Sequence, residues 1–275
     1  MKPVAFDYAR PQTVEEAVSL LSTQPDAKII AGGQTLGPML NLRLAQPALL
    51  IDITRISELA SVEETADAVT LGATVTHAAI EDRRIAADPS HGFLAHVAKG
   101  IAYRAVRTRG TVGGSLAHAD PAADWLSCFT ALAADLLIAG PGGRRRTPLS
   151  TFMRGALDTD LASDEIVVGI SIPKLLRNAR CGYHKICRKT GEFAEAIGVA
   201  VHDPERSVLR LVAGSTQGRP IVIDGKAIGL SDLNSGALDT SRMSDHLREA
   251  GMDDPYEISI HVAALRRAMQ GALVA

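Results

Sequence analysis

The stretch AGGQTLGPMLNLRLAQP, residues 31–47, begins with two adjacent glycines, Gly32 and Gly33. The apolar run before them, residues 28–31, is typical of a short buried strand. Adjacent glycines permit positive φ angles and let another group approach the main chain closely. A plain tight turn would account for one such pair, and so would a loop whose backbone N–H groups face an anion. A second motif is needed to choose between the two interpretations.

A second stretch, TVGGSLAHADPAAD at residues 111–124, places Gly113 and Gly114 between Thr111 and Ser115. We interpret it as a glycine-rich polar loop. Two glycine pairs beside hydroxyl side chains suit a diphosphate, because that ligand needs many N–H and O–H donors and little side-chain bulk. Neither stretch is G-x-G-x-x-G or G-x-x-x-x-G-K-[ST]. The residues alone thus favour a pyrophosphate-containing ligand held by neither a Rossmann crossover nor a P-loop, while two plain turns stay an open interpretation.

Composition restricts the class of protein. The chain has 275 residues, of which 46% are apolar and 22% charged, as in soluble globular proteins of one large or two moderate domains. A net charge of −2 does not favour a nucleic-acid partner. The first residues lack a signal-peptide pattern, and the most apolar stretch, residues 131–139, is too short to span a membrane. We therefore expect a cytoplasmic protein with no membrane span.

The three cysteines, Cys128, Cys181 and Cys187, are too few for a disulfide framework or for four thiolates around an iron–sulfur cluster. We interpret them as small hydrophobic residues of the core.

Helices and strands alternate as far as about residue 175. Thr13 begins a capping-box pattern, which predicts a helix over 14–22. A glycine-rich hairpin-type turn is expected at 140–143, and the three arginines after it are interpreted as a solvated turn. The other predicted helices are 76–82, 90–98 and 122–134, with a helical turn at 40–44. The predicted strands are 28–31, 48–53, 69–73, 136–139 and 166–172.

Past Pro173 the pattern changes. Strand-like runs at 183–188, 196–202 and 208–212 predict an antiparallel meander. A final helix is predicted from apolar residues spaced by three or four. These are Ile258, Val262, Leu265, Met269 and Leu273. We expect a domain boundary near residue 175, with an α/β or α+β first part.

The two glycine stretches resemble the two signatures of the FAD-binding medium subunit of molybdenum hydroxylases, the xanthine dehydrogenase and aerobic carbon monoxide dehydrogenase family. Residues 31–47 are similar to AGG-x-[ST]-L-x-P-x-x-x-x-R, and residues 111–124 to T-[IV]-GG-N-x-x-x-x-D-P-x-x-D. The resemblance runs nearly end to end, and it includes Asp164-Glu-Ile166 and Tyr183-x-Lys185-x-x-Arg188. Carbon monoxide dehydrogenase medium chains are the most similar group, with relatives that hydroxylate N-heterocycles and other small molecules.

The resemblance implies an α+β fold. A FAD-binding domain over 1–175, of the vanillyl-alcohol-oxidase/PCMH-like type, would consist of two subdomains, about 1–55 and 56–175. A C-terminal domain of the carbon monoxide dehydrogenase flavoprotein type, with antiparallel strands plus helices, would follow over 176–275.

The resemblance also implies a FAD site. The first stretch matches the segment that wraps the FAD pyrophosphate, where the amides of residues 32–35 and the Thr35 hydroxyl would donate. Its implied contact residues are Ala31, Gly32, Gly33, Gln34 and Thr35. Those of the second stretch are Thr111, Val112, Gly113, Gly114 and Ser115. The family usually has Asn in place of Ser115; serine is shorter and lacks the amide, and we expect FAD binding to persist with a water in the gap.

Four further contacts are implied by the resemblance. Asp124 would accept a hydrogen bond from a ribityl or ribose hydroxyl, Ile101 would lie against the flavin, and Val167 would contact it through its backbone. Lys185 would lie near the cofactor, where a cation stabilises a phosphate or a reduced, anionic flavin. Without the family resemblance, we would interpret Asp124 as a helix-start residue favoured by the helix dipole and Lys185 as a solvated strand lysine.

The implied activity is electron transfer within a larger oxidoreductase. A small subunit with two [2Fe–2S] clusters and a large subunit with the molybdopterin cofactor would join this chain in a dimer of heterotrimers. Electrons would pass from molybdenum through the clusters to FAD, and then to an external acceptor. No catalytic residue and no metal ligand is expected in this chain, and the loop that brings NAD to the flavin in some relatives is not recognisable. The sequence names neither substrate nor acceptor.

Two other functions stay open at this stage. The chain would be an independent flavoenzyme if it had its own substrate pocket, or a non-catalytic nucleotide-binding assembly module if it bound no flavin. A metal site at His118, Asp120 and Asp124 is a weaker hypothesis. The arginines 104, 107 and 109 fit either a subunit interface or the neighbourhood of the phosphates.

Overall fold

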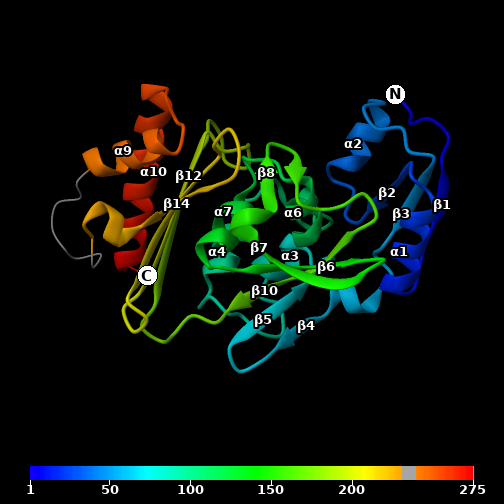
Figure 1. Ribbon diagram of the computed structural model, residues 1–275, viewed down its shortest axis with the longest axis horizontal. Coiled ribbons are helices and arrows are strands. Elements are labelled where there is room, and N and C mark those ends of the chain that lie inside the picture. Colours follow the sequence, from blue (N-terminus) through cyan, green and yellow to red (C-terminus); the bar gives the residue numbers. More distant parts are fainter. Residues whose placement is uncertain (231–239, 275) are drawn as a thin grey trace.

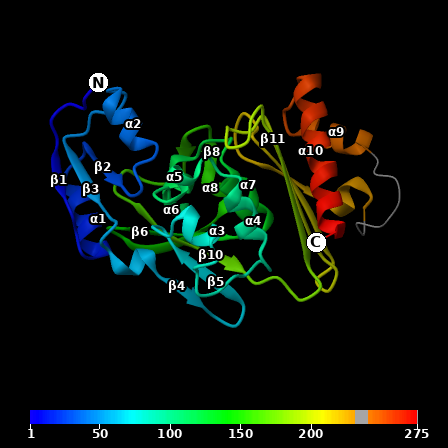
Figure 2. The ribbon, with the colours of Figure 1, turned by 180° about the vertical axis from the view of Figure 1, so that it is seen from behind.

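The computed structural model describes residues 1–230 and 240–274. Figure 1 shows three regions side by side: an N-terminal parallel sheet, a central antiparallel sheet with helices, and a C-terminal sheet with a long helix across it. The same arrangement is seen from behind in Figure 2. The predicted α+β fold is confirmed.

The N-terminal sheet has three parallel strands in the order β1 (Asp7–Ala9), β3 (Leu49–Asp52), β2 (Ala27–Ile30). Helix α1 (Val14–Thr23) joins the first two strands along the chain and buries an apolar face. The predicted cap is present, because the Thr13 hydroxyl accepts from the Glu16 amide at 3.1 Å.

Helix α2 (Leu36–Asn41) follows the first glycine pair directly, which is earlier than the predicted turn at 40–44.

The central sheet is antiparallel, with the order β4 (Val62–Glu64), β5 (Ala68–Gly72), β10 (Ile166–Pro173), β6 (Asp135–Gly140), β7 (Gly143–Pro148). The short 3-10 helix η1 (Ser57–Ala60) leads into it, and β8 (Met153–Gly155) and β9 (Asp158–Thr159) form a separate ribbon. Its helices are α3 (His77–Glu81), α4 (Phe93–Lys99), α5 (Arg104–Arg107), α6 (Val112–His118), α7 (Asp124–Ala131) and α8 (Leu149–Phe152).

The three consecutive arginines do not form the solvated turn expected from the sequence. The predicted turn at 140–143 is present, but Arg144, Arg145 and Arg146 lie in strand β7 and all make ion pairs. Arg145 lies 2.7 Å from Glu165 and 2.9 Å from Asp160. The expectation was wrong because acidic side chains distant in sequence line the same edge of the sheet.

The C-terminal sheet is an antiparallel meander, as predicted: β11 (Arg180–Ile186), β12 (Ala196–Asp203), β13 (Val208–Gly214) and β14 (Ile221–Asp224). One face packs on α7, and the other is covered by α10 (Pro255–Val274), as Figure 1 shows. Helix α9 (Thr240–Glu249) lies beside α10, and the 3-10 helix η2 (Gly225–Ile228) contacts α9 and the strands β13 and β14.

Close packing of α10 depends on a glycine in the strand beneath it. A Cβ on Gly198 would lie 2.6 Å from the Leu265 amide nitrogen, so a larger residue would push the helix away. Of the apolar residues that predicted this helix, Leu273 is an exception, since 48% of it is exposed. The residue before it, Ala272, is fully buried, and a Cβ on Gly182 of β11 would lie 2.6 Å from the Ala272 amide nitrogen, so the helix still lies on the sheet at this turn.

Candidate functional site

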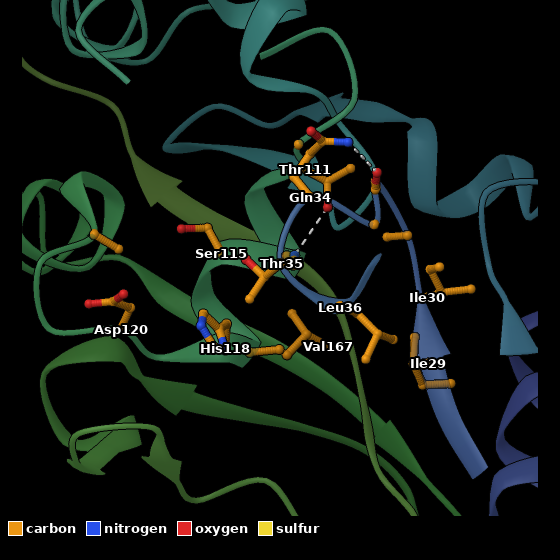
Figure 3. A pocket seen from close by; sticks show the side chains of 18 of the residues that line it. Ile29, Ile30, Gln34, Thr35, Leu36, Thr111, Ser115, His118, Asp120 and Val167 are labelled. Carbon is orange, nitrogen blue, oxygen red and sulfur yellow. Dashed lines mark hydrogen bonds between the residues drawn. The ribbon is translucent and has the colours of Figure 1, made fainter. Parts of the chain in front are cut away.

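A cavity of about 1080 Å³ lies where the three regions meet. Its wall includes residues 27–36 of the N-terminal region, parts of the segment 101–124 of the central region, and residues 191–195 between β11 and β12. Figure 3 shows Gln34 and Thr35 from the first glycine stretch and Thr111 and Ser115 from the second as lining residues of this one cavity. The two motifs therefore contribute to a single site.

The first glycine stretch leaves a row of backbone donors unused. The amides of residues 32–36 make no hydrogen bond to any other described residue; the first amide of this segment to be bonded is that of Gly37, which donates to the Gly33 carbonyl at 2.9 Å. Gly33 has φ +69°, in the left-handed region that suits glycine. Consecutive free amides around such a turn form a concave site for an anion.

At Gly32 the first glycine stretch touches the two residues directly before the second stretch, Arg109 and Gly110. A Cβ on Gly32 would overlap the Arg109 carbonyl oxygen and would lie 3.0 Å from the Gly110 Cα. Only a residue without a side chain lets the two backbones approach so closely. Gly37, in contrast, has open space where a Cβ would be built.

The second stretch is not the polar loop expected from the sequence. Thr111 is the N-cap of α6, and its hydroxyl accepts from the Gly114 amide at 3.1 Å. The amide of Val112 donates to Val75, that of Gly113 to Ala73, and that of Ser115 to Thr111. The backbone donors of residues 112–115 are therefore occupied within the protein, which leaves side-chain hydroxyls as the donors of this segment.

Gly113 has a packing role. A Cβ there would lie 2.8 Å from the Ala73 Cα, so glycine is required for α6 to pack on the end of β5.

Asp124 and Lys185 bind each other. The Lys185 Nζ lies 2.9 Å from the Asp124 carboxylate and also donates to the Gly100 carbonyl at 2.8 Å. The Tyr183 hydroxyl donates to the same carboxylate oxygen of Asp124. Burial, followed by the Asp124 charge, raises the pKa of Tyr183, so this phenol stays protonated and can donate. The lysine is thus buried and paired, and the interpretation of it as a solvated strand lysine was wrong.

The loop carrying Ile101 is held by a buried arginine. Arg107 binds the Glu81 carboxylate through two nitrogens, at 2.8 and 3.0 Å, and donates to the carbonyls of Ile101 and Ala102 at 2.9 and 3.1 Å. These contacts support Ala102 at φ +43°, which is unusual for a residue with a side chain. Arg104 pairs with Glu81 and Asp82, so both arginines are committed to acidic side chains of this chain.

His77 lies on the cavity wall and was not singled out from the sequence. Its Nδ1 accepts a hydrogen bond from the Trp125 Nε1 at 3.0 Å. Burial, together with the charge of Arg107, lowers the pKa of His77 to about 4. The partner residue is 48 positions away in the sequence, so no local pattern could have found the pair.

Of the fourteen residues predicted to contact FAD, twelve line the cavity and two do not. The two are Val112, which is buried in the core, and Lys185, which lies behind Asp124. Tyr103 and Phe193 also line the cavity and are 54% and 73% exposed, although no motif pointed to them.

Two of the three proposed metal ligands, Asp120 and Asp124, have partners within the protein. Asp124 is bound by Lys185 and Tyr183, and Asp120 accepts from the Ala122 amide at 2.9 Å. Within residues 1–230 and 240–274, no group of three His, Cys, Asp or Glu side chains is placed to hold a metal ion. In the same residues, no helix has the length and apolar character to cross a membrane.

The three cysteines are free thiols. Cys128 is fully buried in the core, as expected, whereas Cys181 and Cys187 are only partly buried.

Known proteins share both the sequence and the fold. Residues 4–175 match the family described as the FAD binding domain in molybdopterin dehydrogenase. The chain is 42% identical to the carbon monoxide dehydrogenase medium chain of Hydrogenophaga pseudoflava over 203 residues, 73% of this chain and 70% of the relative. It is 37% identical to the nicotine 6-hydroxylase medium subunit of Paenarthrobacter nicotinovorans over 222 residues, 80% of this chain and 77% of the relative.

Two solved structures extend the similarity beyond residue 175. Carbon monoxide dehydrogenase from Hydrogenophaga pseudoflava aligns with a TM-score of 0.86 and 32% identity, covering 100% of this chain and 99% of the other. Quinoline 2-oxidoreductase from Pseudomonas putida 86 aligns with a TM-score of 0.84 and 31% identity, covering 99% and 98%. The chain therefore belongs to the molybdenum hydroxylase family, as its FAD-binding medium subunit.

Proposed function

We propose that this chain passes electrons from the [2Fe–2S] clusters of a partner subunit through FAD to an external acceptor. The observation that carries the proposal is the row of free amides at residues 32–36 on the wall of the cavity. Such a row suits the pyrophosphate of FAD, because each amide offers a donor without side-chain bulk.

The residues present fit FAD in other respects. The Thr35 hydroxyl makes no capping bond to α2, and Thr111 and Ser115 place two more hydroxyls on the same wall. The glycine at 32 lets the two segments converge, so donors from both reach one volume. Bound FAD would supply reversible redox chemistry, which the side chains of this cavity do not provide by themselves.

The chain's own residues would position and tune the flavin. Ile101 contributes an apolar surface on a loop fixed by Arg107, and Val167 lies at a register shift in β10. Asp124 offers a carboxylate to a ribityl or ribose hydroxyl. We propose that Lys185 acts through this carboxylate and not by direct contact with the cofactor, because it lies behind Asp124 and outside the cavity wall.

Partner subunits would supply the rest of the reaction. The relatives are named a medium chain and a medium subunit, which describes one component of a larger enzyme. Their names refer to carbon monoxide and nicotine, so similarity of this subunit does not select one substrate. We propose a small [2Fe–2S] subunit and a large molybdopterin subunit that binds the substrate, in a dimer of heterotrimers. The cytoplasmic location stays a prediction.

The test is to isolate the native complex through an affinity tag on this chain and to quantify FAD, molybdenum and iron. We expect all three in one complex, with FAD released in proportion to this chain. FAD without molybdenum and iron would instead indicate an independent flavoenzyme. A folded, colourless complex would indicate an assembly module that binds no flavin.

Electron transfer is tested with a flavin-depleted variant of the complex. Gly32→Ala is expected to remove FAD, whereas Gly37→Ala is expected to retain it. Substrate should still bleach the iron–sulfur absorbance of the Gly32→Ala complex, while reduction of the external acceptor stops. Unchanged acceptor reduction in a complex shown to lack FAD would contradict the proposed route.

A further inference from the structure

His77 has one ring nitrogen engaged and one without a partner. Nδ1 accepts from the Trp125 indole at 3.0 Å. Indole N–H groups only donate, so the Nδ1 of His77 must carry a lone pair and not a proton. Because the ring is neutral at ordinary pH, its single proton lies on Nε2. The Trp125 contact thus sets the tautomer.

The Nε2 atom meets the cavity. His77 lines the cavity and is 6% exposed. In the part of the chain that the structure describes, Nε2 makes no hydrogen bond. Among the described residues, the fully buried side-chain atoms without a hydrogen-bond partner are Thr74 Oγ1, Ser127 Oγ and Thr130 Oγ1. The Nε2 of His77 is not one of them, so it is not closed off from the cavity. The N–H is therefore available to a ligand.

His77 lies beside the place where Gly32 of the first glycine stretch meets Gly110. A Cβ on Gly110 would lie 2.9 Å from both Nε2 and Cδ2 of His77, so the ring edge packs directly on this glycine. The His77 amide also donates to the Gly110 carbonyl at 3.0 Å. Gly110 in turn lies against Gly32, next to the free amides.

We propose that His77 Nε2–H donates a hydrogen bond to a pyrophosphate oxygen of bound FAD, with Trp125 as the positioning residue that fixes the tautomer. The proposal rests on the FAD site described above and adds a donor that neither glycine motif contains. A neutral donor suits this position because Arg107 already brings a positive charge close to the ring. Protonation of Nδ1 would break the Trp125 hydrogen bond.

The full chain labelled with [15N]histidine provides a direct test. The His77 signals are assigned by their disappearance in His77→Gln, and the spectra are recorded at neutral pH. We expect nitrogen shifts of the Nε2–H tautomer before any ligand is added. Adding FAD or ADP should move the Nε2–H proton downfield, whereas riboflavin, which has no phosphate, should not.

The ligand series separates this proposal from the proposed function. If the wild-type chain binds no FAD, the FAD site itself is wrong. If FAD binds and the Nε2–H signal does not move, the His77 contact is wrong. A shift with FAD but not with ADP would also overturn the proposal, because the donor would then belong to the flavin half of the ligand.

Binding measurements give a second readout. His77→Leu removes the donor and should weaken FAD binding by about tenfold to a hundredfold, the range for a hydrogen bond to a charged group. His77→Gln keeps an N–H near the Nε2 position and should stay within about threefold of wild type. Equal loss in both variants would indicate a purely structural role and overturn the proposal.

Two further variants complete the test. Trp125→Phe keeps an aromatic ring stacked on Phe129 but removes the indole N–H, so a mixture of His77 tautomers and a smaller loss of affinity are expected. His91→Gln, an exposed histidine outside the cavity, serves as the matched control and should bind FAD as wild type does. A single Nε2–H tautomer retained in Trp125→Phe would show that Trp125 does not fix the proton.

Discussion

Gly32 lies so close to Arg109 that no side chain fits between the two glycine stretches. A Cβ at this position would overlap the Arg109 carbonyl oxygen. The contact joins the segment of free amides after β2 to the segment that leads into α6. Both sides of the cavity wall thus depend on one residue.

We predict that Gly32→Ala abolishes FAD retention while the chain stays folded. The added methyl group must separate the two segments, so the amides and hydroxyls no longer converge. Gly37→Ala is the matched control, because nothing lies within 4 Å of its Cβ position and alanine is favourable in helix α2. Flavin absorbance of the purified proteins and circular dichroism check the prediction. Full flavin occupancy in Gly32→Ala would contradict it.

We predict that Lys185→Met destabilises the chain by about 3–5 kcal/mol, because it leaves the Asp124 carboxylate buried without its cation. Both side chains of the pair are only 9% exposed. Adding Asp124→Asn should recover part of the loss, since a neutral amide needs no counter-charge. Urea unfolding of the single and double variants measures both effects.

Lys174→Met is the control for this prediction. Lys174 pairs with Glu64, but the two side chains are 29% and 55% exposed, so a loss within about 1 kcal/mol is expected. Similar losses for Lys185→Met and Lys174→Met would mean that burial of the Asp124 pair does not matter.

The free energy of unfolding should fall as the pH is lowered from about 6.5 towards 4, because His77 is buried as a neutral ring. The pKa of this histidine is about 4 in the folded chain and 6.5 in the unfolded chain. The unfolded state therefore binds the proton first, and folding loses free energy as the pH falls from about 6.5 towards 4. Between about pH 7.5 and pH 5 the loss is about 2 kcal/mol.

The pH effect is measured by urea unfolding at several pH values above 5. Carboxyl groups with lowered pKa values, such as those of Glu81 and Asp52, change charge below this range. In His77→Gln the slope of unfolding free energy against pH should flatten. An unchanged slope would assign the effect to other histidines.

We predict that Arg107→Lys weakens FAD binding and lowers stability by about 1–3 kcal/mol. Lysine cannot replace a guanidinium that binds one carboxylate through two nitrogens and two carbonyls at once. The loop of Ile101 and Ala102 would then lose its support. Arg84→Lys, at an exposed pair with Asp82, should change neither quantity measurably. FAD titration and urea unfolding check both variants.

Local sequence patterns predicted much of the framework. The cap at Thr13 and the meander after Pro173 depend on residues close together in the chain, and both are present. In the first glycine stretch the amides of residues 32–36 are free, and their contact with FAD stays a prediction. The interpretation of the second stretch as a loop was wrong, because the Thr111 hydroxyl caps a helix and the carbonyls of Ala73 and Val75, directly after β5, accept from the amides of Gly113 and Val112. That arrangement depends on residues nearly 40 positions earlier in the chain.

The sequence by itself determined the glycine spacing, the family and twelve of the residues that line the cavity, because backbone freedom and sequence motifs are properties of short stretches of chain. Only the tertiary structure decided the pairs that give those residues their chemistry. Lys185 and Asp124 are 61 residues apart, and Trp125 and His77 are 48 apart. Whether a lysine is solvated or buried, and which nitrogen of a histidine carries the proton, depends on neighbours that the fold brings together from distant parts of the chain.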